Sequence, residues 1–302
     1  MIASVIHGFL PVFIVIACGY ALRTSAIAPD FVWAGVNRLN YRVLLPALLF
    51  STLAGVDLLS PSAGRLVLLA LAGIALVGVT AFAWSAVLGL SRRNRAAMLA
   101  TTTVWNFVLV LSLSQNLFGA EAVEIAIIIL VPGAILGTLI SRVAVAPNAN
   151  LKALSGAARD PIVVACLLGL AASLTPLSDI TLVMRPLEII ASASIGLVLL
   201  TIGAGLDFAA LRGRYVPLVS AALIRAVVSP IIFLGLGLVA RLGTLELEVL
   251  VLAGAAPTAA FIYALVAESE GEHGLTAGMI TASVLVSALS APAFILIARS
   301  LA

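Results

Sequence analysis

Long apolar runs alternate with short polar gaps from one end of the chain to the other. About 20 apolar residues in helical conformation are enough to cross a bilayer. Taking charged or turn-rich breaks as boundaries, the pattern predicts ten membrane-crossing helices. The expected spans cover 2–22, 33–56, 64–90, 96–118, 122–142, 160–176, 185–206, 215–240, 247–267 and 274–298.

Composition agrees with this pattern. Hydrophobic residues occupy 63% of the 302 positions and charged residues 10%, whereas a soluble domain has about 25% charged residues. The first run is interpreted as a span and not as a signal peptide, because no Lys or Arg precedes it, although VIACG around Cys18 resembles a lipoprotein cleavage site. The sequence therefore predicts an all-α integral membrane protein without a soluble domain.

Basic residues are distributed unevenly between the two sets of alternating loops. Cytoplasmic loops are the ones enriched in Lys and Arg. We therefore expect a multi-pass protein of the cell inner (cytoplasmic) membrane with both termini on the non-cytoplasmic side. The set that begins after the first span holds Arg23, Arg92, Arg93, Arg95, Arg142, Lys152, Arg159, Arg212 and Arg214, and the opposite set holds Arg65, Arg185, Arg241 and Arg299.

The longest gap, VAVAPNANLKALSGAARD, leaves five predicted spans on each side. An odd number of spans per half forces the second half to enter the membrane upside down, as in the inverted repeats of many secondary transporters. The expected organisation is a first five-helix repeat at 1–142, a cytoplasmic linker at 143–159 and a second five-helix repeat at 160–302.

The ninth predicted span, VLAGAAPTAAFIYALVAESEG, is interrupted by Gly254 and Pro257. Proline lacks an N–H and clashes with the preceding turn, so nearby carbonyls lose their helical partners. At mid-membrane, irregular backbone survives only where protein or a water-filled cavity covers it. A half-helix beginning at Pro257 would direct free amides toward the membrane centre, which suits an anion. A simple proline kink is the alternative interpretation.

Polar side chains also occur inside two other predicted spans. The fourth span, MLATTTVWNFVLVLSLSQNLFG, contains Thr103 and Asn106 in its first half. Arg225 lies near the centre of the eighth span, where an ionisable side chain is a functional candidate. It would either attract a substrate and shape the local electrostatics, or pair with a carbonyl or an acid. The small-xxx-small spacing of GAILG at 133–137 predicts close helix contact.

Four segments are distinctive: NRLNYRVLLPALLF in the second expected span, RDPIVVACLLGL in the sixth, IGLVLLTIGAGL in the seventh and AAPTAAFIYALVAE in the ninth. Each resembles the corresponding span of the auxin efflux carrier family, which includes plant PIN-formed transporters and many bacterial permeases and has the fold of bile-acid symporters. The resemblance implies ten helices in two inverted five-helix repeats, with spans four and nine broken and crossing at mid-membrane. One departure affects span four, because Asn106 is followed by FVLVLSLS without the family's Gly and Pro.

The resemblance also implies a mechanism. Spans one, two, six and seven would form a scaffold, and spans three to five and eight to ten a core that moves against it in elevator-type alternating access. Bacterial relatives are often described as malate or malonate permeases, so the expected substrate is a small organic anion, a mono- or dicarboxylate. Relatives often form homodimers, although nothing in this sequence marks an interface. The expected substrate-binding residues are Thr103, Asn106, Ala256, Pro257, Thr258 and Arg225.

The sequence lacks the motifs that other functional classes require. It has two histidines and no HExxH, GxSxG or GxxxxGK[ST] motif, so we expect no enzyme, catalytic residue, metal site, cofactor or nucleic-acid partner. The absence of a mid-membrane carboxylate favours uniport, while Thr103, Asn106 and Thr258 leave Na⁺ coupling open, and H⁺ coupling is a third option. A membrane-embedded metabolite sensor is the competing hypothesis, against which the short loops argue.

Overall fold

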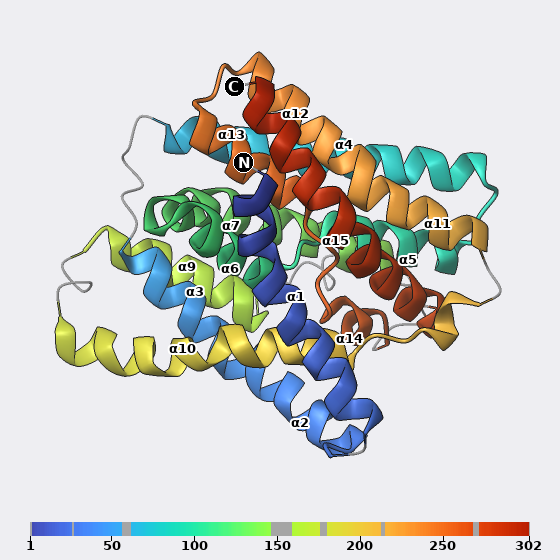
Figure 1. Cartoon of the computed structure of the whole chain (residues 1–302), viewed down its shortest axis with the longest axis horizontal. Helices are drawn as coiled ribbons and strands as arrows, with labels where there is room; N and C mark the ends of the chain where they lie inside the picture. The colour runs from blue at the N-terminus through green and yellow to red at the C-terminus, as the bar shows by residue number, and fades with distance from the viewer. Residues whose placement is uncertain are drawn as a thin grey trace.

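The computed structural model describes residues 2–25, 27–55, 62–145, 159–175, 180–212, 215–267 and 272–301. Every regular element in these ranges is helical (Figure 1). The α-helices are α1 (Ile2–Thr24), α2 (Asp30–Leu39), α3 (Leu45–Ala54), α4 (Ala63–Val87), α5 (Arg92–Thr103), α6 (Phe107–Phe118), α7 (Ala120–Val145), α9 (Pro161–Ser173), α10 (Thr181–Ala204), α11 (Tyr215–Leu223), α12 (Ser229–Val239), α13 (Thr244–Ala255), α14 (Ile262–Ala267) and α15 (His273–Leu301). Two π-helical turns, η1 (Asn40–Leu44) and η4 (Ile224–Val228), and a 3₁₀ turn, η3 (Ala209–Leu211), complete the list.

Six helices in the described ranges are long and apolar enough to cross a membrane. This confirms the prediction of an all-helical protein with many membrane spans. The other predicted spans fall on bent, short or interrupted elements: α2 to α3, α5 with α6, α9, and α13 with α14. The linker expected at 143–159 lies largely outside the described residues, as do Lys152 and Arg214 among the basic loop residues.

The helices pack as two groups. In Figure 1, α2, α3, α9 and α10 lie together along the lower side, while α4, α11, α12 and α15 lie along the upper side. Within the lower group α3 packs against both α9 and α10. Helix α1 packs along α10 of this group. Within the upper group α5 and α4 pack on α7, and α13 packs on α12 and α15. Because α1 also contacts α6 and α15, it lies between the two groups.

Glycines allow the closest approaches between helices. A Cβ atom at Gly203 on α10 would overlap the backbone carbonyl of Ile16 on α1. In GAILG, a Cβ at Gly133 would meet the ring of Trp105 at 2.7 Å, and one at Gly137 would overlap the carbonyl of Thr103. Small residues let membrane helices approach at backbone distance. The spacing of GAILG therefore marks close contact, as predicted, and the contact is with the interrupted region that follows α5.

Each π-helical turn lies immediately before a helix with proline in its first turn. Leu45 N donates to Asn40 O in η1, ahead of Pro46, and Ser229 N donates to Ile224 O in η4, ahead of Pro230. Proline cannot donate to the carbonyl four residues earlier, and the wider i to i+5 bond accommodates that loss. The inserted residue rotates the preceding side chains relative to a regular helix, and such bulges are frequent at functional sites.

Candidate functional site

Two helices are interrupted at the centre of the molecule. The first interruption separates α5, which ends at Thr103, from α6, which begins at Phe107. The second separates α13, which ends at Ala255, from α14, which begins at Ile262. The chain therefore breaks span four without the Gly and Pro that the resemblance associated with this break.

The two interrupted segments pair with each other. Trp105 and Thr258 form an isolated antiparallel bridge. Some of the backbone groups loosened at one break thus find partners at the other, as polar backbone groups in the membrane interior need hydrogen bonds. The bridging hydrogen bonds run from Asn106 N to Pro257 O at 2.9 Å and from Ala259 N to Val104 O at 3.3 Å.

Asn106 explains why the first break needs no glycine or proline. It is the N-cap of α6, with φ −80° and ψ 93°, and its Oδ1 accepts a hydrogen bond from Leu109 N at 3.2 Å. Asn is among the strongest N-cap residues, because its side chain satisfies an amide that has no intrahelical partner. A new helix therefore starts here, and Val104 before it is extended, with φ −111° and ψ 120°.

Backbone around the second break is anchored by neighbouring hydroxyl groups. Thr258 N donates to Ser283 Oγ at 3.1 Å, and the Thr258 hydroxyl donates to Thr101 O at 2.5 Å. Ala256 N donates to Ala253 O at 3.3 Å. The half-helix expected to begin at Pro257 is not formed there, because α14 begins only at Ile262. The amide of Thr258, expected to be free, is therefore engaged by the protein.

Arg225 holds the end of the interrupted helix α13. The side chain is fully buried, and its guanidinium donates to Ala253 O and Gly254 O, each at 3.3 Å, and to Ser229 Oγ at 2.9 Å. Ser229 Oγ in turn donates to Gly254 O at 2.8 Å. These carbonyls terminate α13, where the helix dipole is negative and a cation is favourable. Of the two roles considered for Arg225, the structure shows the pairing with carbonyls.

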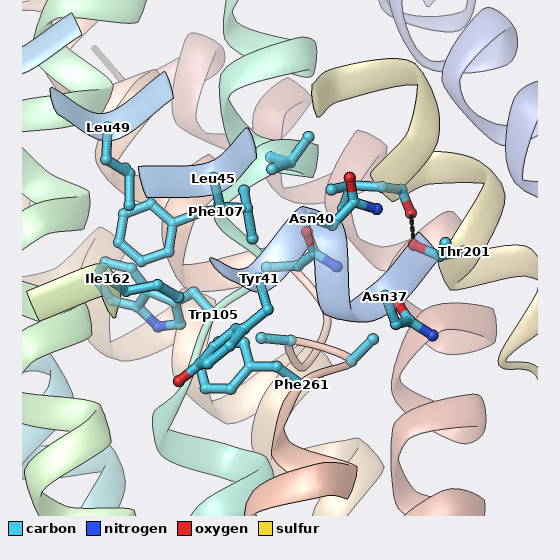
Figure 2. Close-up of a pocket in the computed structure, with 15 residues that line it drawn as sticks. Asn37, Asn40, Tyr41, Leu45, Leu49, Trp105, Phe107, Ile162, Thr201 and Phe261 are labelled. Atoms are coloured by element: carbon cyan, nitrogen blue, oxygen red, sulfur yellow. Dashed lines mark hydrogen bonds between the residues drawn. The ribbon is translucent and has the colours of Figure 1, made fainter. Parts of the chain in front are cut away.

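A cavity lies beside the paired segments (Figure 2). Its volume is about 60 Å³, which is room for several water molecules. The walls come from α2, η1, α3, α9 and α10 on one side and from the two interrupted segments on the other. The lining residues are Asn37, Asn40, Tyr41, Leu45, Leu49, Trp105, Asn106, Phe107, Val108, Ile162, Val198, Thr201, Ala259, Ala260 and Phe261.

Of the six residues expected to bind substrate, Asn106 lines this cavity. Thr103 is buried with its hydroxyl donating to Leu99 O at 2.7 Å. Thr103, Arg225 and the segment 256–258 lie outside the lining and instead support the crossing backbone. Sequence reasoning missed Asn37, Asn40, Tyr41 and Thr201, although the polar residues of NRLNYRVLLP ahead of Pro46 offered a signal.

A buried ionic cluster adjoins the cavity at Tyr41. Tyr41 Oη donates to Asp160 Oδ2 at 2.5 Å, and Arg142 donates to the same oxygen at 2.9 Å. Asp160 Oδ1 accepts from Ile162 N at 3.0 Å, so the carboxylate also caps α9. Because Arg142 belongs to α7, this cluster connects the two groups of helices at one edge of the cavity.

One comparison with known proteins identifies a relationship. A family model described as "Membrane transport protein" matches residues 145–295, which is half of the 302-residue chain. The match includes α9 to α14, the second interruption and Arg225. No curated protein matches the chain.

Proposed function

The chain belongs to the membrane transport protein family of the auxin efflux carriers, and on this premise we propose that it moves a small organic anion, a mono- or dicarboxylate, across the membrane by alternating access. Family membership makes the protein a membrane transporter and does not favour the sensor hypothesis. The substrate class and the mechanism are our proposal.

The observation that carries it is the position of the cavity at the antiparallel bridge between Trp105 and Thr258. Binding sites of secondary transporters are built at mid-membrane from interrupted helices whose ends carry unpaired backbone groups. A ligand in this cavity would touch both groups of helices at once. Relative movement of the groups would then carry the ligand from one side of the membrane to the other.

The preference for an anion rests on the start of α6. Phe107 and Val108 line the cavity, and their amides precede the first intrahelical bond, which Val110 N donates to Asn106 O at 3.2 Å. The first amides of a helix and the positive end of its dipole favour negative charge. Asn106 adds a donor, because its Oδ1 is engaged by Leu109 N while its Nδ2 makes no hydrogen bond to the described residues.

Arg225 and the residues around Pro257 have an indirect part in this proposal. The Arg225 guanidinium holds the carbonyls of Ala253 and Gly254, which fixes the end of α13. Pro257 O holds Asn106 N, and Thr258 holds Thr101 O. The crossover is thus shaped by these residues, while Asn106 and the α6 amides face the substrate.

We further propose the ten-helix arrangement. Its scaffold would be α1, α2 to α3, α9 and α10, matching the lower group of Figure 1 together with α1. The core would comprise α4, α5 with α6, α7, α11 to α12, α13 with α14, and α15. The two five-helix repeats would lie at 1–142 and 160–302, in inverted orientation. The Arg142–Asp160 pair would then join core to scaffold in this conformation.

Uptake of radiolabelled short carboxylates into proteoliposomes tests the function, with membrane potential, Na⁺ and pH gradients imposed one at a time. We expect saturable uptake of at least one acid, and the gradient that accelerates it identifies the coupling. Absence of uptake for every acid under every gradient would overturn the organic-anion proposal.

Two substitutions of one residue test the site. Asn106→Asp keeps an acceptor for Leu109 N and so preserves the cap of α6, but it replaces the amide donor with a negative charge. Asn106→Ala removes cap and donor together. We expect uptake to fall at least about tenfold in both variants, which corresponds to about 1.4 kcal/mol in the activation free energy of transport. Asn106→Asp should keep near-native thermal stability. Full uptake by Asn106→Asp would contradict anion binding at this point.

A further inference from the structure

Asn40 is a buried amide without a partner. Its exposed fraction is 3%, and neither Nδ2 nor Oδ1 makes a hydrogen bond to any described residue. Buried polar groups in folded proteins are almost always hydrogen-bonded, and an unpaired one is costly. Among the described side chains with unpaired buried atoms, Asn40 stands out because both sides of its amide are unpaired and because it lines the cavity (Figure 2).

The backbone places Asn40 there by a specific distortion. It is the first residue of η1, and its carbonyl accepts the wide bond from Leu45 N. The distortion separates α2 from α3 on the wall of the cavity that faces the interrupted helices. Asn40 therefore shares the lining of the cavity with Asn106 and the start of α6, and it belongs to the proposed scaffold side.

We propose that Asn40 determines substrate specificity by binding an organic anion that carries a hydroxyl group next to its carboxylate. The proposal rests on the transport function above and specifies its substrate. A carboxylate oxygen accepts from Asn40 Nδ2, and the adjacent hydroxyl donates to Asn40 Oδ1. One side-chain amide can engage both groups at once, since it offers donor and acceptor side by side.

Neighbouring groups select a hydroxyl over an ammonium as the donor. No Asp or Glu is among the cavity's lining residues, so nothing there would neutralise a positive charge. The nearby Asp160 carboxylate is already bonded to Tyr41, Arg142 and Ile162 N. Thr201, also on the wall, donates its hydroxyl proton to Val198 O at 2.8 Å, which leaves its oxygen as a second acceptor for a ligand hydroxyl.

The test compares matched acids in proteoliposomes. Uptake of lactate is measured against propionate, and malate against succinate, because each pair differs by one hydroxyl group. We expect the wild type to prefer the hydroxylated acid of at least one pair by about tenfold or more in kcat/KM, since a site built around a hydroxyl rejects the analogue lacking it. Asn40→Leu and the smaller Asn40→Ala should bring this ratio close to one.

Thermal melting in detergent separates binding from a structural role. Replacing an unpaired buried amide by an apolar side chain of similar size removes a cost, so Asn40→Leu should melt at or above the wild-type temperature without ligand. The hydroxy acid should raise the wild-type melting temperature and leave that of Asn40→Leu unchanged. A lower melting temperature for Asn40→Leu without ligand would assign a structural role and overturn the proposal.

Ser194 provides the matched control. It is fully buried on α10, its hydroxyl is unpaired among the described residues, and it does not line the cavity. Ser194→Ala should keep the wild-type preference for the hydroxylated acid.

Two outcomes overturn this inference alone: a wild type that takes up both acids of each pair equally, or an Asn40→Leu variant that keeps the preference for the hydroxylated acid. A wild type that takes up no acid overturns the transport proposal and this inference with it.

Discussion

Trp105 and Thr258 face each other as a single antiparallel bridge between two interrupted helices. Each residue lies in a segment that is not helical, and hydrogen bonds on both sides of the bridge join the backbones of the two segments. The Trp105 ring also packs edge-on against Phe233 of α12, with ring centroids 5.3 Å apart. The crossing is thus a paired structure, in which each break supplies hydrogen-bond partners for the other.

Replacing Pro257 tests that dependence. Pro257→Ala permits α13 to continue, which would withdraw the carbonyl of residue 257 from Asn106 N. We expect uptake to fall about tenfold or more, which corresponds to about 1.4 kcal/mol in the activation free energy of transport. The melting temperature should change by only a few degrees. Equal losses of uptake and stability would favour a simple kink. Pro292→Ala is the control, because Pro292 lies within the continuous helix α15, and it should leave uptake nearly unchanged.

Substitutions of Arg225 distinguish hydrogen bonding from charge. The planar guanidinium reaches Ala253 O and Gly254 O together, which an ammonium group cannot reproduce. We expect Arg225→Lys and Arg225→Met both to lower stability by about 2 kcal/mol, measured as thermal melting in detergent. If Arg225→Lys keeps wild-type stability and uptake while Arg225→Met loses uptake, transport depends on the positive charge and not on the capping of α13.

The ionic cluster at Asp160 gives a prediction of relative stabilities. Asp160→Asn removes the charge opposite Arg142 but keeps a good N-cap for α9, and we expect a loss of about 2 kcal/mol. Asp160→Ala also removes the cap and should lose about 1 kcal/mol more. Thermal or denaturant melts give the order. The Arg185–Glu188 pair, with side-chain exposures of 70% and 51%, is the control, and Glu188→Gln should change stability by less than about 0.5 kcal/mol.

Two glycines of α10 test the packing of the proposed scaffold. A side chain at Gly203 would overlap the Ile16 carbonyl of α1, whereas a Cβ at Gly196 would meet nothing within 4 Å. Gly203→Ala should therefore separate α1 from α10 and lower the melting temperature by several degrees. Gly196→Ala should be neutral or stabilising by up to about 1 kcal/mol, because alanine favours helix. Equal melting temperatures for the two variants would mean that α1 and α10 do not pack this closely.

Much of the fold follows from local properties of the sequence. Apolar runs of membrane-spanning length predict the helices, because lipid offers no hydrogen bonds and a helix satisfies its backbone polar groups within its own segment. Pro257 marks the second interruption by its own covalent structure, since it cannot donate. Family membership is likewise carried by short segments, several of which lie within the matched range 145–295.

The first interruption shows where local reasoning becomes insufficient. Asn106 is a good N-cap in any sequence, but whether a helix ends before it depends on partners for the loosened backbone. Those partners are Pro257 and Ala259, about 150 positions away. Likewise, the sequence marks Arg225 as exceptional in an apolar span, yet its hydrogen bonds to Ala253 and Gly254 exist only because α12 packs on α13.

The sequence by itself therefore determined that this protein lies in a membrane, that it is helical, that the helix around Pro257 is irregular, and to which family it belongs. The first three follow from hydrophobic burial or from the covalent chemistry of single residues, and the family follows from short similar segments. Only the tertiary structure decided which side chains meet at the crossing, that Asn40 lines the cavity with its amide unpaired, and that Arg225 is engaged with backbone carbonyls. Such contacts join residues far apart in the chain, and packing selects them after the helices themselves are fixed.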